Sequence, residues 1–176
     1  MTLESGTAAP PFYLTDARGK KHGLAEMLAH GPVLLVFFKI SCTTCQYALQ
    51  FVGRLGAHLR GARAAVRTIS QDSIEHTRMF IEEFALPLDP LFDLEEDGFP
   101  VSEAYQISTV PSSFLLDGSG RIQIASAGWS KDDFEAMAAG LAASSGAGVP
   151  RPWEPSELWE PGERVESWRP GCSSKN

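Results

Sequence analysis

In this sequence of 176 residues, the side chains best suited to chemistry are two cysteines separated by two threonines, Cys42 and Cys45. A thiol attacks a disulfide as the thiolate, and a free cysteine with a pKa of about 8.5 is mostly protonated at neutral pH. A helix N-terminus stabilises the thiolate through its unpaired N–H groups and partial positive charge. Cys42 follows an apolar run that ends at Ile40, where a helix is expected to begin. We therefore expect Cys42 to be the attacking sulfur, and Cys45, one turn further, to expel a mixed disulfide.

Two simpler interpretations of the pair remain open. Cysteine is often a small buried hydrophobic residue without chemistry. A structural zinc ion takes four ligands, and the chain has neither a second C-x-x-C pair nor paired histidines. Its histidines are scattered, and we expect them at the surface: His22, His30, His58 and His76. The position at a strand–helix junction favours redox chemistry over both.

The elements that must position the dithiol are visible as patterns. Val33–Phe38 is a nearly continuous apolar run, typical of a central strand that is covered on both faces. The helix that follows is expected to reach Leu59, with Gly53 and Gly56 weakening it and marking a bend. The other expected strands are 12–14, 64–69, 91–94, 113–117 and 121–125, and the other expected helices are 24–29, 74–84, 101–105 and 130–141.

The connections between these elements indicate the fold class. Asp72 and Glu75 resemble a capping box at the start of helix 74–84. The segment 118–120, Gly-Ser-Gly, stands between two strands as a hairpin turn. The order of strands and helices followed by a hairpin predicts an α/β sheet with an antiparallel edge.

Charge and hydropathy limit the partners. The formal net charge is −7, with no local cluster of Lys and Arg, which disfavours nucleic acid and anionic membranes as partners. The apolar run 33–40 is too short to cross a bilayer and contains Lys39. Residues 1–10 contain no basic segment followed by an apolar run, so we expect a cytoplasmic protein.

The composition changes near the C-terminus, which predicts a domain at 1–146 and a Pro/Trp-rich tail at 147–176. Proline at this density disfavours a regular helix or a central strand. We expect the tail to pack its tryptophans on the domain or on a second subunit, with its cysteine, Cys172, incidental. The alternative is that Cys172 exchanges with the disulfide of the C-x-x-C pair, because about 25 irregular residues at roughly 3.3 Å each can span a small domain.

With the dithiol placed after this strand, the chain resembles the thioredoxin superfamily, in particular its redoxin branch of AhpC/TSA- and TlpA-like proteins. Residues 9–20 are similar to that branch's N-terminal hairpin, 109–117 to its cis-proline strand and 118–122 to its later hairpin. The resemblance covers about residues 8–142. It implies a thioredoxin-like α/β fold, a central mixed sheet flanked by helices with an N-terminal β-hairpin extension, and no cofactor.

The resemblance also implies a substrate-binding backbone at Thr109, Val110 and Pro111, with Val110–Pro111 in the cis form beside the dithiol. Only about 5–6% of X-Pro bonds in folded proteins are cis, and the residues alone favour an ordinary trans proline. The chain departs from its relatives at Ser41, where many carry Trp, and at Thr43–Thr44, where a Pro- or Gly-containing pair is usual. It also lacks the buried acid that many thioredoxins place beneath the dithiol.

Thiol–disulfide exchange with a protein or small-molecule partner is therefore the expected function, with electrons from an external thioredoxin- or glutathione-type system. Lys39 adds positive charge if its side chain turns toward Cys42. The first alternative is a peroxiredoxin-like peroxidase in which Cys45 resolves the sulfenic acid of Cys42. Against it, Lys39 stands three residues before Cys42, where peroxiredoxins place Thr. The second alternative is a non-catalytic adaptor that presents the tail to a partner.

Overall fold

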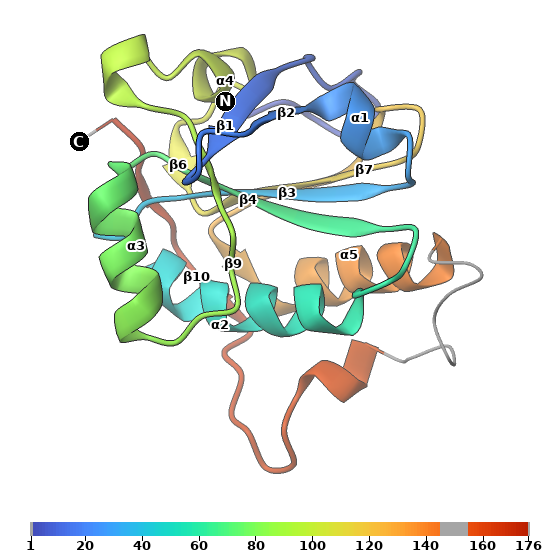
Figure 1. The fold of residues 1–176 in the computed structure, drawn as a ribbon. Helices are drawn as coiled ribbons and strands as arrows, with labels where there is room; N and C mark the ends of the chain where they lie inside the picture. Colours follow the sequence, from blue (N-terminus) through green and yellow to red (C-terminus); the bar gives the residue numbers. More distant parts are fainter. Residues whose placement is uncertain (1, 145–154, 176) are drawn as a thin grey trace.

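One mixed sheet of seven strands forms the centre of the protein, which the computed structural model describes for residues 2–144 and 155–175 (Figure 1). The strands are Tyr13–Asp16 (β1), Lys21–Gly23 (β2), Val33–Phe38 (β3), Ala65–Ser70 (β4), Leu91–Phe92 (β5), Ser112–Leu116 (β7) and Ile122–Ala127 (β8). Their order is β2-β1-β5-β4-β3-β7-β8. β3 pairs parallel with β4 and antiparallel with β7. The expected thioredoxin-like α/β fold with an N-terminal hairpin, β1–β2, is confirmed.

Helices cover both faces of the sheet. They are Leu24–Leu28 (α1), Thr43–His58 (α2), Ile74–Glu83 (α3), Pro100–Ala104 (α4) and Lys131–Ser144 (α5), with single 3-10 turns at Glu95–Asp97 (η1) and Pro155–Leu158 (η2). In Figure 1, α2 and α5 lie below the sheet, and α1 and α4 lie above it. Within the described residues, no helix is long and apolar enough to span a bilayer.

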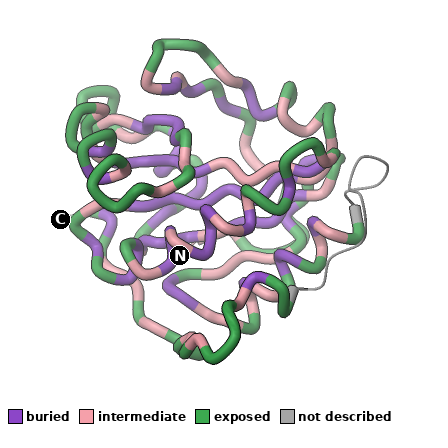
Figure 2. Tube along the Cα trace, turned by 60° about the horizontal axis from the view of Figure 1, so that its bottom comes forward, coloured by how far each residue is buried: buried purple, intermediate pink, exposed green. Residues whose placement is uncertain are grey.

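Strand β3 joins two hydrophobic cores because successive side chains of a strand point to opposite faces. Leu34 and Val36 pack with α2 and α5, whereas Leu35 and Phe37 pack on the other face with Tyr105. All six residues of β3 are buried, and Figure 2 shows such buried segments running through the middle of the molecule. The C-terminal end of β3, where the dithiol segment begins, is therefore held from both sides.

Helix α2 continues through both of its glycines as a single element of 16 residues. Gly53 is buried, and a Cβ atom at this position would lie 3.0 Å from two ring carbons of Pro87. A Cβ atom at Gly56 would meet no heavy atom within 4 Å. Gly53 is thus explained by close packing of α2 on the loop that contains Pro87, whereas Gly56 has no such explanation.

Two sequence-based expectations about polar residues are wrong. The N-cap of α3 is Ser73, whose hydroxyl accepts from the N–H of His76, and not Asp72. Asp72 instead accepts from the N–H of Ile40 at 2.7 Å. His22 is half-buried rather than exposed, because it pairs with the fully buried carboxylate of Asp16 at 2.9 Å. That contact and backbone hydrogen bonds lower the pKa of Asp16 well below its ordinary value.

The tail lies along the domain from η2 to Lys175, and the predicted boundary at 146/147 and Trp153 fall outside the described residues. Trp168–Arg169 (β10) pairs with Trp129–Ser130 (β9), and Cys172–Ser173 (β11) pairs with Thr109–Val110 (β6). Leu158 is buried and Trp159 packs against the same core. The tail therefore contains short edge strands, which fits the expectation that prolines exclude a central strand.

The two glycines of α2 give a matched test of packing. Gly56→Ala is expected to raise the free energy of unfolding by roughly 0.5–1 kcal/mol, because alanine restricts the unfolded chain and meets open space here. Gly53→Val is expected to lower it by about 1–3 kcal/mol, because the added carbons press on Pro87. Urea denaturation of both variants measures the difference, and a stabilised Gly53→Val protein contradicts the packing described for α2.

Candidate active site

The dithiol lies at the junction between β3 and α2. Cys42 is the N-cap of α2, with φ −84° and ψ 115°, and its sulfur accepts from the N–H of Cys45 at 3.3 Å. The turn before it is fixed by two hydrogen bonds of Ile40, whose N–H donates to Asp72 and whose carbonyl accepts from the Gln46 side chain at 2.8 Å. The strand–turn–helix arrangement expected from the sequence is present.

Cys42 is the acidic thiol of the pair. Its pKa is lowered from an ordinary value of 9.0 to about 5. The largest cause is a hydrogen bond with the side chain of Cys45, and burial acts in the opposite direction. A hydrogen bond with the Cys172 side chain and the backbone N–H groups of Cys45 and Thr44 lower the pKa further. The sequence analysis assigned this effect to the helix end, with Lys39 as an auxiliary charge, and missed the two neighbouring thiols.

Cys45 has the opposite protonation state. Burial raises the pKa of Cys45 far above its ordinary value, and the hydrogen bond with Cys42 raises it further. Its side chain is fully buried. At neutral pH the site therefore holds one thiolate and one thiol, and Cys45 must release its proton when it attacks.

The peptide bond between Val110 and Pro111 is cis, as the resemblance implies. Cys42 Sγ lies 3.4 Å from the carbonyl oxygen of Val110, a hydrogen-bonding distance for a thiol. The preceding backbone is fixed because the hydroxyl of Ser112 donates to the carbonyl of Thr109 at 2.6 Å. The structure thus places Thr109, Val110 and Pro111 beside the dithiol.

Cys42 is almost inaccessible to solvent, although it is the expected attacking sulfur. Only 2% of its surface is exposed. The tail strand β11 lies beside it, with Cys172 opposite Val110 and Ser173 opposite Thr109 in the antiparallel register. Cys172 also packs against the core cluster that contains both dithiol cysteines. The backbone edge expected to receive a substrate is therefore already paired.

Three residues to which the sequence analysis gave no role at the site belong to this arrangement. Thr44 is buried, and its hydroxyl donates to the carbonyl of Pro170 at 2.7 Å. Gly171 passes so close to β6 that a Cβ atom there would lie 2.1 Å from a methyl carbon of Thr109. Asp72 holds the turn before the dithiol. A sequence signal existed only for Gly171, as a glycine that directly precedes a cysteine.

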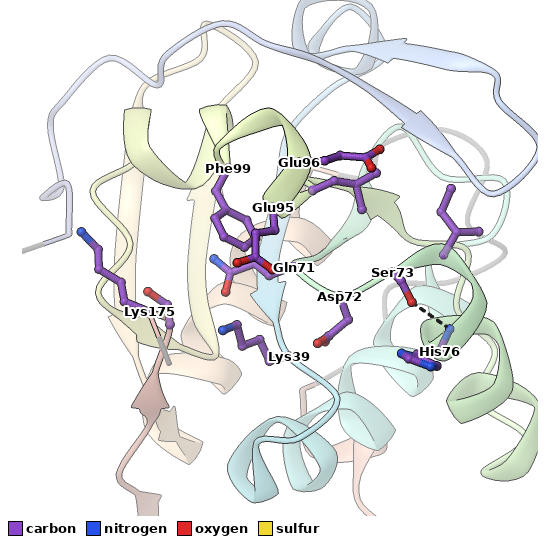
Figure 3. Close-up of a pocket in the computed structure, with 12 residues that line it drawn as sticks. Lys39, Gln71, Asp72, Ser73, His76, Glu95, Glu96, Phe99 and Lys175 are labelled. Atoms are coloured by element: carbon purple, nitrogen blue, oxygen red, sulfur yellow. Dashed lines mark hydrogen bonds between the residues drawn. The ribbon is translucent and has the colours of Figure 1, made fainter.

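The side chain of Lys39 lines a pocket of about 870 Å³ that neither dithiol cysteine lines (Figure 3). Figure 3 shows it between Lys175 of the tail and Asp72. The carbonyl of Lys39 accepts from the N–H of Cys42 at 3.3 Å. Lys39 thus reaches the dithiol through its backbone, while its side chain joins the pocket.

Residues 5–125 of the chain match the AhpC/TSA family. The matched segment contains the dithiol and the cis proline and ends before the tail. The chain belongs to the AhpC/TSA family, as the sequence motifs indicate.

Two of the curated relatives are thiol-disulfide oxidoreductases named ResA. The chain is 27% identical over 133 residues to the thiol-disulfide oxidoreductase ResA of Geobacillus kaustophilus, with 74% of each protein covered. It is 29% identical over 121 residues to ResA of Bacillus thuringiensis subsp. konkukian, with 68% of each covered.

Solved structures show the same fold. A putative thiol:disulfide interchange protein DsbE from Chlorobium tepidum aligns with a TM-score of 0.69 at 22% identity, covering 81% of this chain and 98% of that one. Peroxidoxin BcpB from Mycobacterium tuberculosis aligns with a TM-score of 0.67 at 20% identity, covering 80% and 97%. The fold is therefore common to proteins named for disulfide exchange and to one named as a peroxidoxin.

The lowered pKa of Cys42 gives a pH-dependent signal. The ultraviolet absorbance of the thiolate in the reduced protein is expected to disappear around pH 5, and Cys45→Ala is expected to raise that midpoint by removing the largest stabilising hydrogen bond. Since the unfolded thiol titrates near 9.0, the thiolate's contribution to stability is complete above that pH and is lost as the pH falls through about 5. A midpoint near 9 in the wild-type protein contradicts the described hydrogen bonds.

Proposed function

We propose that this protein is a thiol–disulfide oxidoreductase in which Cys42 and Cys45 exchange a disulfide with disulfide-containing protein partners. The observation that carries the proposal is the pairing of an anionic Cys42 with a protonated Cys45 one helical turn further, beside a cis proline. The relatives named ResA support this assignment.

The chemistry follows from the two protonation states. In the reducing direction, the Cys42 thiolate attacks a substrate disulfide, a Cys42–substrate bond forms, and the other substrate sulfur leaves as a thiolate. Cys45 then gives up its proton and attacks Cys42 Sγ, which forms the Cys42–Cys45 disulfide and releases the second substrate sulfur. The substrate gains two electrons and the dithiol loses two. A proton acceptor is needed at the second step. The strand before the dithiol has no acidic residue to take this proton, so the proposed acceptor is water or another group.

The finer assignments are part of the proposal. An external electron donor, a thioredoxin- or glutathione-type system, is proposed to reduce the Cys42–Cys45 disulfide. The backbone of Thr109 and Val110 is proposed to pair with an extended substrate segment in place of β11, since a strand edge binds peptides by adding a strand. The cytoplasmic location expected from the sequence stays a prediction, which fractionation of cells producing the full chain tests.

The peroxidase alternative has less support. The relatives reported above by identity are named as oxidoreductases of thiols and disulfides, and a peroxidoxin appears only as a neighbour in fold. Stopped-flow oxidation by hydrogen peroxide separates the two functions. Compared at equal thiolate concentration, we expect Cys42 to react no faster than free cysteine, and a rate faster by orders of magnitude favours the peroxidase.

Substitution of each cysteine tests the exchange reaction. Reduction of insulin and of glutathione disulfide by the full chain is expected to fall about a hundredfold or more in Cys42→Ser, because the nucleophile is lost. The double variant Cys45→Ser/Cys172→Ser, which keeps no second thiol to attack Cys42, is expected to remain trapped as a mixed disulfide. Turnover by Cys42→Ser at the wild-type rate contradicts the nucleophile, and a wild-type protein that exchanges with neither substrate favours the adaptor.

A further inference from the structure

The last residues of the tail occupy the edge of β6 that a substrate strand would use. Cys172 and Ser173 form the ladder with β6, and Ser174 extends it with two more hydrogen bonds. The N–H of Ser174 donates to the carbonyl of Ser108 at 3.1 Å, and its hydroxyl donates to the carbonyl of Ile107 at 2.9 Å. Ser174 is buried as a result. This part of the tail is therefore held to the domain as a hydrogen-bonded strand.

The fit between tail and domain requires glycine on both sides. A Cβ atom at Gly171 would lie 2.1 Å from Thr109 Cγ2 and 2.8 Å from the carbonyl oxygen of Val110. Gly128 has φ +82°, and a Cβ atom there would lie 2.7 Å from the carbonyl oxygen of Arg169. Only residues without a side chain allow backbones to approach this closely. The two glycines therefore set the depth at which the next tail residue, Cys172, enters the site.

Upstream contacts hold the tail near the site. Arg54 on α2 makes a bidentate ion pair with Glu163, with N–O distances of 2.7 and 2.9 Å. The indole N–H of Trp129 donates to the carbonyl of Glu166, whose N–H donates to the hydroxyl of Tyr47, both at 2.7 Å. Because the segment is tethered, Cys172 acts at a high effective concentration relative to any free thiol.

The position of Cys172 is that of a substrate cysteine. It stands opposite Val110, whose carbonyl oxygen lies 3.4 Å from Cys42 Sγ. Cys42 is 2% exposed and Cys45 is fully buried, whereas Cys172 is partly exposed. Among the three cysteines, Cys172 is thus the one that adjoins both the dithiol and the solvent.

We propose that Cys172 is a third redox thiol of this site, which forms a disulfide with Cys42 while the tail occupies the substrate edge of β6. The proposal rests on the proposed function of Cys42 as the nucleophile. Starting from the Cys42–Cys45 disulfide, the sulfur of Cys172 attacks Cys42 Sγ, the Cys42–Cys172 bond forms, and Cys45 leaves and takes up the proton that Cys172 loses. One disulfide replaces another, so no oxidant is consumed, and the disulfide moves to a partly exposed sulfur that a partner thiolate can attack.

A trapping experiment tests the bond. Cys45→Ser protein is treated with glutathione disulfide, digested with trypsin under non-reducing conditions and analysed by mass spectrometry. Cys42 first becomes glutathionylated, and Cys172 then displaces glutathione as a thiol. We expect most of the protein to contain peptide 40–54 linked to peptide 165–175. The double variant Cys45→Ser/Cys172→Ser is expected to keep glutathione on Cys42.

The outcomes separate the two proposals. Stable glutathionylation of Cys42 with Cys172 left as a free thiol in Cys45→Ser overturns the third-thiol proposal and leaves the proposed function intact. Absence of any disulfide on Cys42 in both variants overturns the proposed nucleophile, and the third-thiol proposal with it.

A substitution outside the three cysteines tests whether the docked strand positions Cys172. Gly171→Val is expected to lower the Cys42–Cys172 fraction in the Cys45→Ser background about tenfold, because valine cannot fit against Thr109. In the otherwise wild-type reduced protein, it is expected to raise the rate of Cys42 alkylation by iodoacetamide by about tenfold. Gly118→Val, in a turn where a Cβ atom meets nothing within 4 Å, is the matched control and is expected to change neither quantity. If the Cys42–Cys172 fraction and the alkylation rate are the same in Gly171→Val and in the control, the proposal that the docked strand positions Cys172 for reaction is overturned.

Discussion

The negative charge on Cys42 is the constraint around which this molecule is organised. A thiolate held at 2% exposure needs donors in place of water, and they come from the first turn of α2, from Cys45 and from Cys172. These donors depend on two parts of the chain. The buried strand β3 fixes where α2 begins, and with it the first turn and Cys45, while the tail ladder fixes Cys172. A change far from the dithiol, such as one in the tail, can therefore alter the acidity of Cys42.

The parts of the site that local patterns encode could be read from the sequence. The apolar run of β3 has six buried residues because it is central, and the C-x-x-C pair follows it at a helix start. The cis form of Val110–Pro111 was accessible only through family resemblance, since no local pattern distinguishes it from a trans proline.

The parts that depend on contacts between distant segments could not be read in this way. Cys172 lies more than a hundred residues from Cys42 in sequence, and a strand of two residues has no periodicity that would predict its partner. The burial of Cys42 was not anticipated either, because the tail strand that lies beside it comes from a distant part of the chain. Asp72 resembled a helix cap by type and spacing, but its carboxylate is used by the N–H of Ile40 instead.

With the proposed use of β6 by substrates, the ladder between β11 and β6 makes partner selection a competition. A protein segment that pairs with Thr109 and Val110 must first replace a strand already joined to the same backbone. Its apparent affinity is reduced by the fraction of molecules in which the edge is vacant, so an edge vacant in about 1% of molecules weakens every ligand about a hundredfold. Segments whose backbone pairs weakly are thereby rejected, whatever the reactivity of their disulfide. Discrimination among partners then depends on the chain's own C-terminal segment as much as on the strand edge that it covers.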